Sequence, residues 1–137
     1  MARHTVMKVI HFSYGHRLLN YDGACRHLHG HNGVIEVEVT SDGLDAHGMV
    51  VDFGEIRDVV KGWVDANLDH RMLLCRDDPA VEILRGMHEP VYVLDGNPTA
   101  ENIAREIFLK AREQGLAIAE VRLWETPSSY AAYRGEE

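Results

Sequence analysis

The stretch from Cys25 to His31 places one thiol and three imidazoles, those of His27, His29 and His31, close together in the chain. Residues 33–39, which follow, alternate apolar and polar side chains, and this pattern predicts a half-buried β-strand. Continuing the two-residue period backwards puts His29 and His31 on the apolar side, about 7 Å apart along the strand. Two imidazoles that face the same way at this separation can share one metal ion.

A third imidazole is predicted to join this pair. Residues 6–16 also alternate, which predicts a first strand whose last residue, His16, points to the same side as Phe12. Three neutral imidazoles with no fourth protein ligand are typical of a catalytic zinc, which keeps one position open for water or substrate. The alternative is that all three are ordinary strand histidines. We interpret the other histidines as surface or structural residues: His4, His11, His27, His47 and His88.

Cys25 precedes His29 by four positions, close enough to lie beside such a metal. It could be a fourth ligand, which would close the site and make it structural. It could instead be a small buried apolar residue. A third reading is a reactive thiolate, because a metal, His27 and Arg26 would each favour the ionised thiol. The spacing does not choose between these roles. Cys75 has no such neighbours and is interpreted as structural.

Two further features could take part in chemistry. Asp69 and His70 directly follow a predicted helix, where a carboxylate can orient an imidazole suited to proton transfer near neutral pH. The simpler interpretation is a helix-terminal histidine beside a solvated carboxylate. Glu125 shares the strand parity of Val121 and Leu123, so its carboxylate is predicted on an apolar side, where it needs a partner. A ligand with a fork of N–H donors, such as the edge of a guanine or pterin, would satisfy it; alternatively, Glu125 reaches water at the strand end.

The composition indicates a single domain, residues 1–137, long enough to bury a core. The net charge of −8 argues against nucleic-acid binding through a general basic surface. The two cysteines do not make a disulfide framework. No apolar stretch has the length of a signal peptide or a membrane span, so we expect a soluble cytoplasmic protein with no membrane partner.

The predicted elements give an α+β domain. Five strands are expected, at residues 6–16, 29–40, 49–53, 118–126 and 129–134, the third forming a hairpin with the second. They make an antiparallel β-sheet with two helices on one face. One helix covers about residues 54–67, where apolar residues recur at helical spacing, and another runs from an N-cap at Thr99 to Gly115. A short helix near 81–84 and an extended piece at 91–94 are also predicted.

Several of these residues belong to motifs that occur in a specific order: Phe12–Leu18, Cys25-x3-His29-Gly30-His31, Asp52-Phe53, Leu68-Asp69-His70, Pro98–Asn102 and Trp124-Glu125-Thr126. Together they resemble the 6-pyruvoyl-tetrahydropterin synthase family, most of all its bacterial 6-carboxy-tetrahydropterin synthase branch in queuosine biosynthesis. The resemblance runs over nearly the whole chain, and the motifs are specific as a set rather than singly.

The resemblance implies a tunnelling fold (T-fold), in which three subunits join their sheets into a barrel and two trimers stack into a homohexamer, with active sites between subunits. It implies Zn2+ on His16, His29 and His31, and 7,8-dihydroneopterin triphosphate as the small-molecule substrate. The products would be 6-carboxy-5,6,7,8-tetrahydropterin, acetaldehyde and triphosphate. Arg17 and Arg26 are candidates for holding the triphosphate only because they lie near the motifs.

The resemblance also implies roles for the other candidates. Cys25 becomes the general base rather than a zinc ligand. Asp69 and His70 become its proton-transfer partners, and His70 can come from a neighbouring subunit. Glu125 anchors the N–H groups of the pterin, with Thr126 beside it as a substrate-binding residue.

Departures from the family pattern leave alternatives open. The Cys-x3-His spacing before His29 resembles the carboxy branch, since the pyruvoyl branch has a longer gap. Residues 13–15 stand where smaller side chains are usual, and residues 75–97 are longer than in compact members, which bears on substrate fit rather than on the metal. Pyruvoyl-tetrahydropterin formation and folate-directed side-chain cleavage are alternatives within the family. A non-catalytic protein with a zinc site closed by Cys25 is an alternative outside it.

Overall fold

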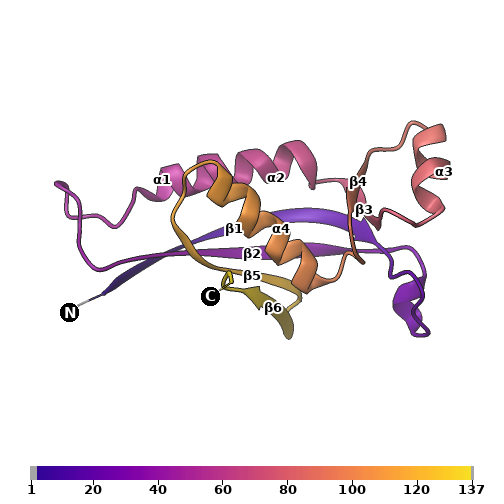
Figure 1. The fold of residues 1–137 in the computed structure, drawn as a ribbon, viewed down its shortest axis with the longest axis horizontal. Helices are drawn as coiled ribbons and strands as arrows, with labels where there is room; N and C mark the ends of the chain where they lie inside the picture. The colour runs from indigo at the N-terminus through magenta and orange to yellow at the C-terminus, as the bar shows by residue number, and fades with distance from the viewer. Residues whose placement is uncertain (1–2, 137) are drawn as a thin grey trace.

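A computed structural model describes residues 3–136, and its centre is a pair of long strands, β1 (His4–His16) and β2 (His29–Ser41), which form an antiparallel hairpin (Figure 1). β5 (Ile118–Thr126) pairs with β2, and β6 (Ser129–Tyr133) pairs with β5, both antiparallel. These four strands confirm the prediction from sequence. β1, β2 and β5 alternate more buried and less buried residues, because one face of the sheet packs on the core.

Beyond β1 the sheet continues with two short strands, β3 (Arg71–Cys75) and β4 (Val91–Leu94), in the order β4-β3-β1-β2-β5-β6. Both β1–β3 and β3–β4 pair in parallel, so the prediction of a wholly antiparallel sheet is wrong at this edge. Leu73 and Leu74 are both fully buried. A strand buried on both faces has no alternating pattern, and for this reason β3 was not predicted from the sequence.

The predicted third strand at residues 49–53 is absent from the described structure, and this prediction is also wrong. The segment after β2 is instead a loop closed by Asp45, whose carboxylate accepts hydrogen bonds from the N–H groups of His47 and Met49. Asp52 then caps a helix, because its side chain accepts from the N–H of Gly54 at 2.7 Å. Val50 and Val51 pack against the core without strand pairing.

Both long helices were predicted. The first consists of α1 (Phe53–Ile56), a π-helical stretch (Arg57–Lys61) and α2 (Gly62–Asn67) in direct succession. The second, α4 (Ala100–Glu113), has Thr99 as its N-cap, and Gly115 follows it with a φ of +91°. The short helix α3 (Ala80–Gly86) and the single turn η1 (Ala24–Arg26) complete the fold.

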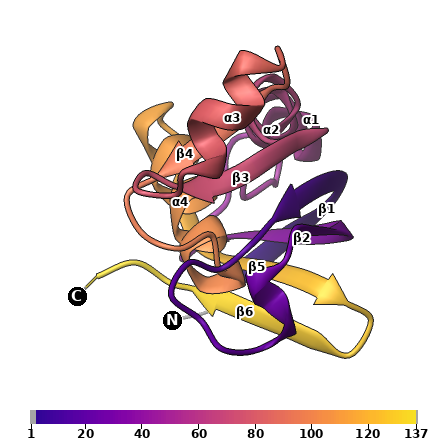
Figure 2. The same cartoon turned by 90° about the vertical axis from the view of Figure 1, so that its right-hand side faces the viewer.

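The helices α1, α2 and α4 lie on one side of a curled sheet, as the end-on view shows (Figure 2). The core between these layers draws on alternate residues of the strands and on the apolar stripe of α4, including Ile35, Val37, Ile103 and Phe108. The result is the α+β arrangement expected. No helix in the described part of the chain is both long and apolar enough to span a membrane.

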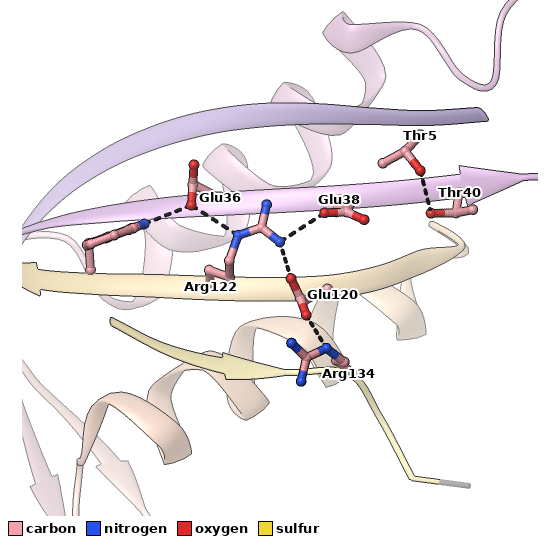
Figure 3. A network of polar contacts seen from close by, with 8 residues as sticks. Thr5, Glu36, Glu38, Thr40, Glu120, Arg122 and Arg134 are labelled. Atoms are coloured by element: carbon pink, nitrogen blue, oxygen red, sulfur yellow. Dashed lines mark hydrogen bonds and ion pairs between the residues drawn. The ribbon is translucent and has the colours of Figure 1, made fainter. Parts of the chain in front are cut away.

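The opposite face of β2, β5 and β6 carries a network of charged side chains (Figure 3). Arg122 at its centre donates to Glu36 at 3.0 Å and to Glu38 at 2.9 Å, and it also pairs with Glu120. Glu120 in turn pairs with Arg134. Residues 36 and 38 were predicted on the face away from the core, and they lie there.

Candidate active site

The register of the hairpin brings the three predicted histidines together. His16 at the end of β1 lies opposite His29 at the start of β2, and Tyr14 lies opposite His31. One ring nitrogen of each histidine lies within 4.8 Å of the others. Between the two histidine positions, Gly15 pairs with Gly30, and a Cβ on Gly30 would lie 2.9 Å from the carbonyl oxygen of Tyr14. The glycine pair therefore permits the close strand approach on which the cluster depends.

Main-chain carbonyl groups orient two of the imidazoles. Nδ1 of His16 donates to the carbonyl oxygen of Pro98 at 2.7 Å, and Nδ1 of His29 donates to that of His27 at 2.7 Å. Because a carbonyl only accepts, both Nδ1 atoms carry a proton, and in the neutral ring this tautomer leaves the lone pair on Nε2 for a metal. Nε2 of His29 is buried without a hydrogen-bond partner in the described structure. Donor set and orientation thus fit a metal ion held by three neutral imidazoles.

Burial also favours the neutral form of His16, which is 3% exposed. Desolvation lowers the pKa of its imidazole below the ordinary value of 6.5, and the hydrogen bond to Pro98 and the charge of Glu125 offset only part of that effect. His16 Nε2 lies 3.1 Å from Nε2 of His31. Since His16 has no proton on that atom, this short contact needs either a proton on His31 or a cation between the two rings.

Glu125 lies beside the histidines, on the side of β5 that the sequence predicted. Its Oε1 is 3.8 Å from Nε2 of His16, and its Oε2 is 3.8 Å from Nε2 of His31. The buried hydroxyl of Tyr14 donates to Oε1 at 2.9 Å. Burial raises the pKa of Tyr14, and the Glu125 carboxylate raises it further, so the phenol keeps its proton. Thr126, the next residue, is exposed at the start of the turn to β6.

Cys25 lies on η1, the short turn that precedes the two β2 histidines, and its side chain is exposed. Within residues 3–136 the group of close metal-ligating atoms contains the three histidines and not the thiol. The reading of Cys25 as a small buried residue is therefore wrong. Its exposure leaves the thiol accessible to a ligand.

Asp69 and His70 form the dyad that the sequence predicted, and the two side chains bond directly, with Nδ1 of His70 2.8 Å from Oδ2 of Asp69. The other carboxylate oxygen accepts from the N–H of Ser13 at 2.9 Å. Although burial raises the pKa of Asp69, the N–H of Ser13 and the His70 ring lower it by more. The simpler interpretation took this carboxylate as solvated. In the structure it is partly buried and hydrogen-bonded on both oxygens.

The imidazole of His70 is exposed to solvent. Its side chain is 80% exposed, and its main chain has a φ of 59°, fixed by a 2.7 Å hydrogen bond from its N–H to the carbonyl oxygen of Ser13. A non-glycine residue in the left-handed region costs energy and is enriched at functional sites. His70 lines a pocket with Gly15, Met72 and Glu89 that includes neither Cys25 nor the histidine cluster.

Two contributors to the site were missed in the sequence. Tyr14 shares the parity of Phe12 and His16, and this could have indicated that its hydroxyl lies on the cluster's side. The carbonyl of Pro98 belongs to a turn eighty-two residues from His16 in sequence, and no local signal connects them.

Comparison with known proteins identifies the family of this chain. A family model described as 6-pyruvoyl tetrahydropterin synthase matches residues 5–136. The chain belongs to the 6-pyruvoyl tetrahydropterin synthase family. The resemblance read from the motifs is thereby confirmed over nearly the whole chain.

Relatives within this family are similar over most of their length. A 6-carboxy-5,6,7,8-tetrahydropterin synthase from Rickettsia bellii is 42% identical over 128 residues, covering 88% of this chain and 93% of the relative. One of the same name from Haemophilus influenzae is 33% identical, covering 94% and 97%.

Solved structures of similar fold support the T-fold assignment. An uncharacterized protein from Wolinella succinogenes superposes with a TM-score of 0.84 at 26% identity, covering 99% of this chain and 100% of that one. The 6-pyruvoyl tetrahydropterin synthase of Caenorhabditis elegans gives a TM-score of 0.75 at 26% identity, covering 99% and 98%.

Proposed function

We propose that this chain is a zinc-dependent 6-carboxy-5,6,7,8-tetrahydropterin synthase that acts in queuosine biosynthesis. It would convert 7,8-dihydroneopterin triphosphate and water to 6-carboxy-5,6,7,8-tetrahydropterin, acetaldehyde and triphosphate. The observation that carries the proposal is the convergence of three imidazole nitrogens, within 4.8 Å of one another, beside an oriented carboxylate. The names of the relatives from Rickettsia bellii and Haemophilus influenzae support the choice of product.

His16, His29 and His31 would hold the zinc. When bound, the metal supplies Lewis acidity to the hydroxyl groups of the substrate side chain, which makes the adjacent C–H more acidic. Their Nδ1–H bonds to main-chain carbonyls fix the tautomer of His16 and His29 and aim both rings at one point, while burial favours the neutral form of His16. Three protein ligands leave a coordination position for the substrate.

Cys25 is assigned the general base that removes this proton, and Asp69 and His70 return a proton elsewhere on the substrate. The exposed thiol and the outward-facing imidazole suit contact with a ligand. His70 lines a pocket to which Cys25 of the same chain does not contribute. This arrangement favours a site completed between subunits, in which one chain provides Cys25 and its neighbour provides His70.

The sheet edges support such an assembly. β4 and β6 end the sheet, so each has a single strand neighbour in the chain. Open strand edges are ready to pair with another copy. We assign the oligomer as a homohexamer of two stacked trimers, with the sheets joined into a barrel.

Glu125 is assigned the anchor of the pterin ring, with Thr126 beside it. The hydroxyl of Tyr14 donates to Oε1, and Oε2 is left to accept an N–H of the ligand. Each carboxylate oxygen has two lone pairs, so Oε1 can accept from Tyr14 and still join Oε2 in accepting the fork of N–H donors on an amino-pyrimidine edge.

Formation of 6-pyruvoyl-tetrahydropterin is the second candidate, favoured by the name of the structural neighbour from Caenorhabditis elegans. Folate-directed cleavage of the pterin side chain is the third. The four-residue step from Cys25 to His29, together with the more similar carboxy relatives, places both behind the leading proposal.

The experiment tests whether Cys25 is the general base or a zinc ligand. In Cys25→Ala, zinc content should equal that of the parent protein, while turnover of 7,8-dihydroneopterin triphosphate falls by at least about 100-fold, because general base catalysis contributes about that much. Metal analysis and mass spectrometry of the products supply the two measurements. The mass of the parent's product distinguishes the carboxy, pyruvoyl and folate-directed outcomes.

Cys75→Ala is the matched control, because this second thiol is buried at the end of β3 and donates to the carbonyl oxygen of Asp95. It should retain both zinc and turnover. Loss of zinc in Cys25→Ala alone would make Cys25 a ligand and support the closed, structural site instead.

A further inference from the structure

The turn before α4 clamps the loop that follows β1. The side-chain amide of Asn97 makes two hydrogen bonds to one residue, Leu19: the N–H of Leu19 donates to Oδ1 at 2.7 Å, and Nδ2 donates to the carbonyl oxygen of Leu19 at 2.9 Å. Both hydrogen bonds are partly buried, and they join residues that are distant in sequence. An amide that satisfies both polar groups of one residue fixes the position of that main chain.

The main chain of Asn97 is itself fixed by the start of α4. Its carbonyl oxygen accepts from the N–H of Thr99 at 2.8 Å and from Nδ2 of Asn102 at 2.8 Å. Asn102 also donates its own N–H to the Thr99 hydroxyl, the helix N-cap, at 3.2 Å. Asn97 is therefore tied to α4 through its main chain and to the β1 loop through its side chain.

The carbonyl group that orients His16 lies in the same turn, next to Asn97. It belongs to Pro98, which is buried and receives the Nδ1 proton of His16 at 2.7 Å. Proline has a fixed φ and no N–H of its own. The direction of its carbonyl is thus set by the neighbours Asn97 and Thr99, and any rotation of the turn would move it away from the imidazole.

A second tie secures the chain immediately after His16. Nε of Arg17 donates to Asp78 at 2.7 Å, and the carboxylate, whose side chain is fully buried, also accepts the N–H of Ala80 at 2.8 Å. The guanidinium is therefore committed to Asp78 of the β3–α3 connection. The residues after His16 are held at two points, Arg17 and Leu19, by the segment between β3 and α4.

We propose that Asn97 is a positioning residue for the metal site, which sets the tautomer and direction of the His16 imidazole by holding Pro98 against it. It touches neither metal nor substrate and acts through His16. The inference rests on the metal role of His16 in the proposed function. It also assigns a role to residues 75–97, because this segment contains Asp78 and Asn97, which hold the loop after His16.

The first measurement needs no metal. Long-range 1H–15N NMR of the zinc-free full-length protein, labelled at histidine, should show His16 as the pure Nδ1–H tautomer. In Asn97→Ala the same ring should become a mixture of tautomers, because the turn that carries the Pro98 acceptor is no longer tied to the loop that follows His16. Asn97→Asp keeps the acceptor for Leu19 N–H and loses the donor, so it should be intermediate.

The second measurement is zinc affinity by chelator competition. Asn97→Ala should weaken zinc binding about 10- to 100-fold, the usual effect of removing an orienting group behind a ligand. Asn67→Ala is the matched control, because its amide also donates to a carbonyl oxygen, that of Trp63 at 2.9 Å, but at the end of α2. It should leave both the tautomer and the affinity unchanged.

Two results would overturn the inference: Asn97→Ala with a pure Nδ1–H tautomer and parental zinc affinity, or equal losses of zinc affinity in Asn97→Ala and Asn67→Ala. A parent protein that binds no zinc would refute the proposed function alone. In that case the tautomer measurement still decides whether Asn97 positions His16.

Discussion

Two polar clusters lie on opposite faces of β2 and β5, and they differ in how completely their charges and lone pairs are matched. On the face of the sheet away from the helices, here called the open face, Arg122 pairs with three carboxylates. One of them, Glu36, also accepts the indole N–H of Trp124 at 2.7 Å. On the helix side, the histidine cluster has one phenolic donor for Glu125, and Nε2 of His29 is left without a partner within residues 3–136.

The difference indicates what each cluster does. A partly buried network in which each carboxylate has a cationic partner is complete without any ligand, and its role is structural. Convergent lone pairs that lack donors are costly when buried, and a cation would relieve that cost. Incomplete matching, rather than the density of polar groups, distinguishes the candidate metal site from the charged network.

The largest expected effect comes from removing a metal ligand. His31→Ala should abolish zinc binding, measured by metal analysis, because two imidazoles are a poor zinc site. The free energy of unfolding of the zinc-free protein should change by no more than about 1 kcal/mol, since the lost side chain is partly exposed and serves the ligand. A loss of several kcal/mol in the zinc-free protein would contradict the functional reading of this cluster.

Glu125→Gln is the companion variant for the same cluster. It should keep the zinc and weaken binding of the tetrahydropterin product, because the amide replaces an acceptor oxygen with a donor. Loss of zinc in this variant would instead make Glu125 a metal ligand.

Much of this contrast could be read from sequence, because both clusters depend on strand alternation. The two-residue period placed His29 and His31 on one face, and residues 36 and 38 on the other. The same period gave β1, β2, β5 and β6, and the 3.6-residue period gave the two long helices. Local capping chemistry located the start of α4 at Thr99.

Most of what could not be predicted depends on partners distant in sequence. β3 has no alternation because the consecutive residues Leu73 and Leu74 are buried on opposite faces of the sheet. The contacts of Asn97 with Leu19 cross seventy-eight positions. Residues 49–53 failed for a local reason instead: the apolar run indicated a strand, but Asp45 and Asp52 supply side-chain acceptors that favour a closed loop and a helix cap.

The next largest effect concerns the matched network. Arg122→Ala should lower the free energy of unfolding by about 3 kcal/mol, because it leaves Glu36, Glu38 and Glu120 close together without their shared cation. Zinc content should not change. Urea denaturation and metal analysis test the two statements.

Arg3→Ala is the matched control for Arg122→Ala. Its ion pair with Asp42 is highly exposed, so its removal should change stability by no more than about 0.5 kcal/mol. A similar small effect for Arg122→Ala would show that the open-face network is also incomplete without a partner, and the contrast between the two clusters would fail.

The smallest expected effect depends on pH. The indole N–H of Trp124 is the main cause that holds the pKa of Glu36 below its ordinary value of 4.5, with Arg122 contributing in addition. A carboxylate whose pKa is lowered on folding stabilises the protein fully above its unfolded pKa and loses that contribution as the pH falls through its folded pKa. Trp124→Phe should therefore cost about 1.5 kcal/mol at pH 7, the usual worth of a hydrogen bond to a charged group.

This cost should shrink below about pH 4.5, once Glu36 takes up a proton in the unfolded state and then in the folded state. Urea denaturation followed by circular dichroism at pH 7, 5, 4 and 3 measures it, and the phenyl ring preserves an aromatic partner for Tyr130, whose ring centroid lies 4.5 Å from that of Trp124. A loss of the same size at every pH would assign the effect to ring packing. The carboxylates of the open face would then gain their stability from the cations Arg122 and Arg134, and the matching of the network would rest on charge rather than on the indole donor.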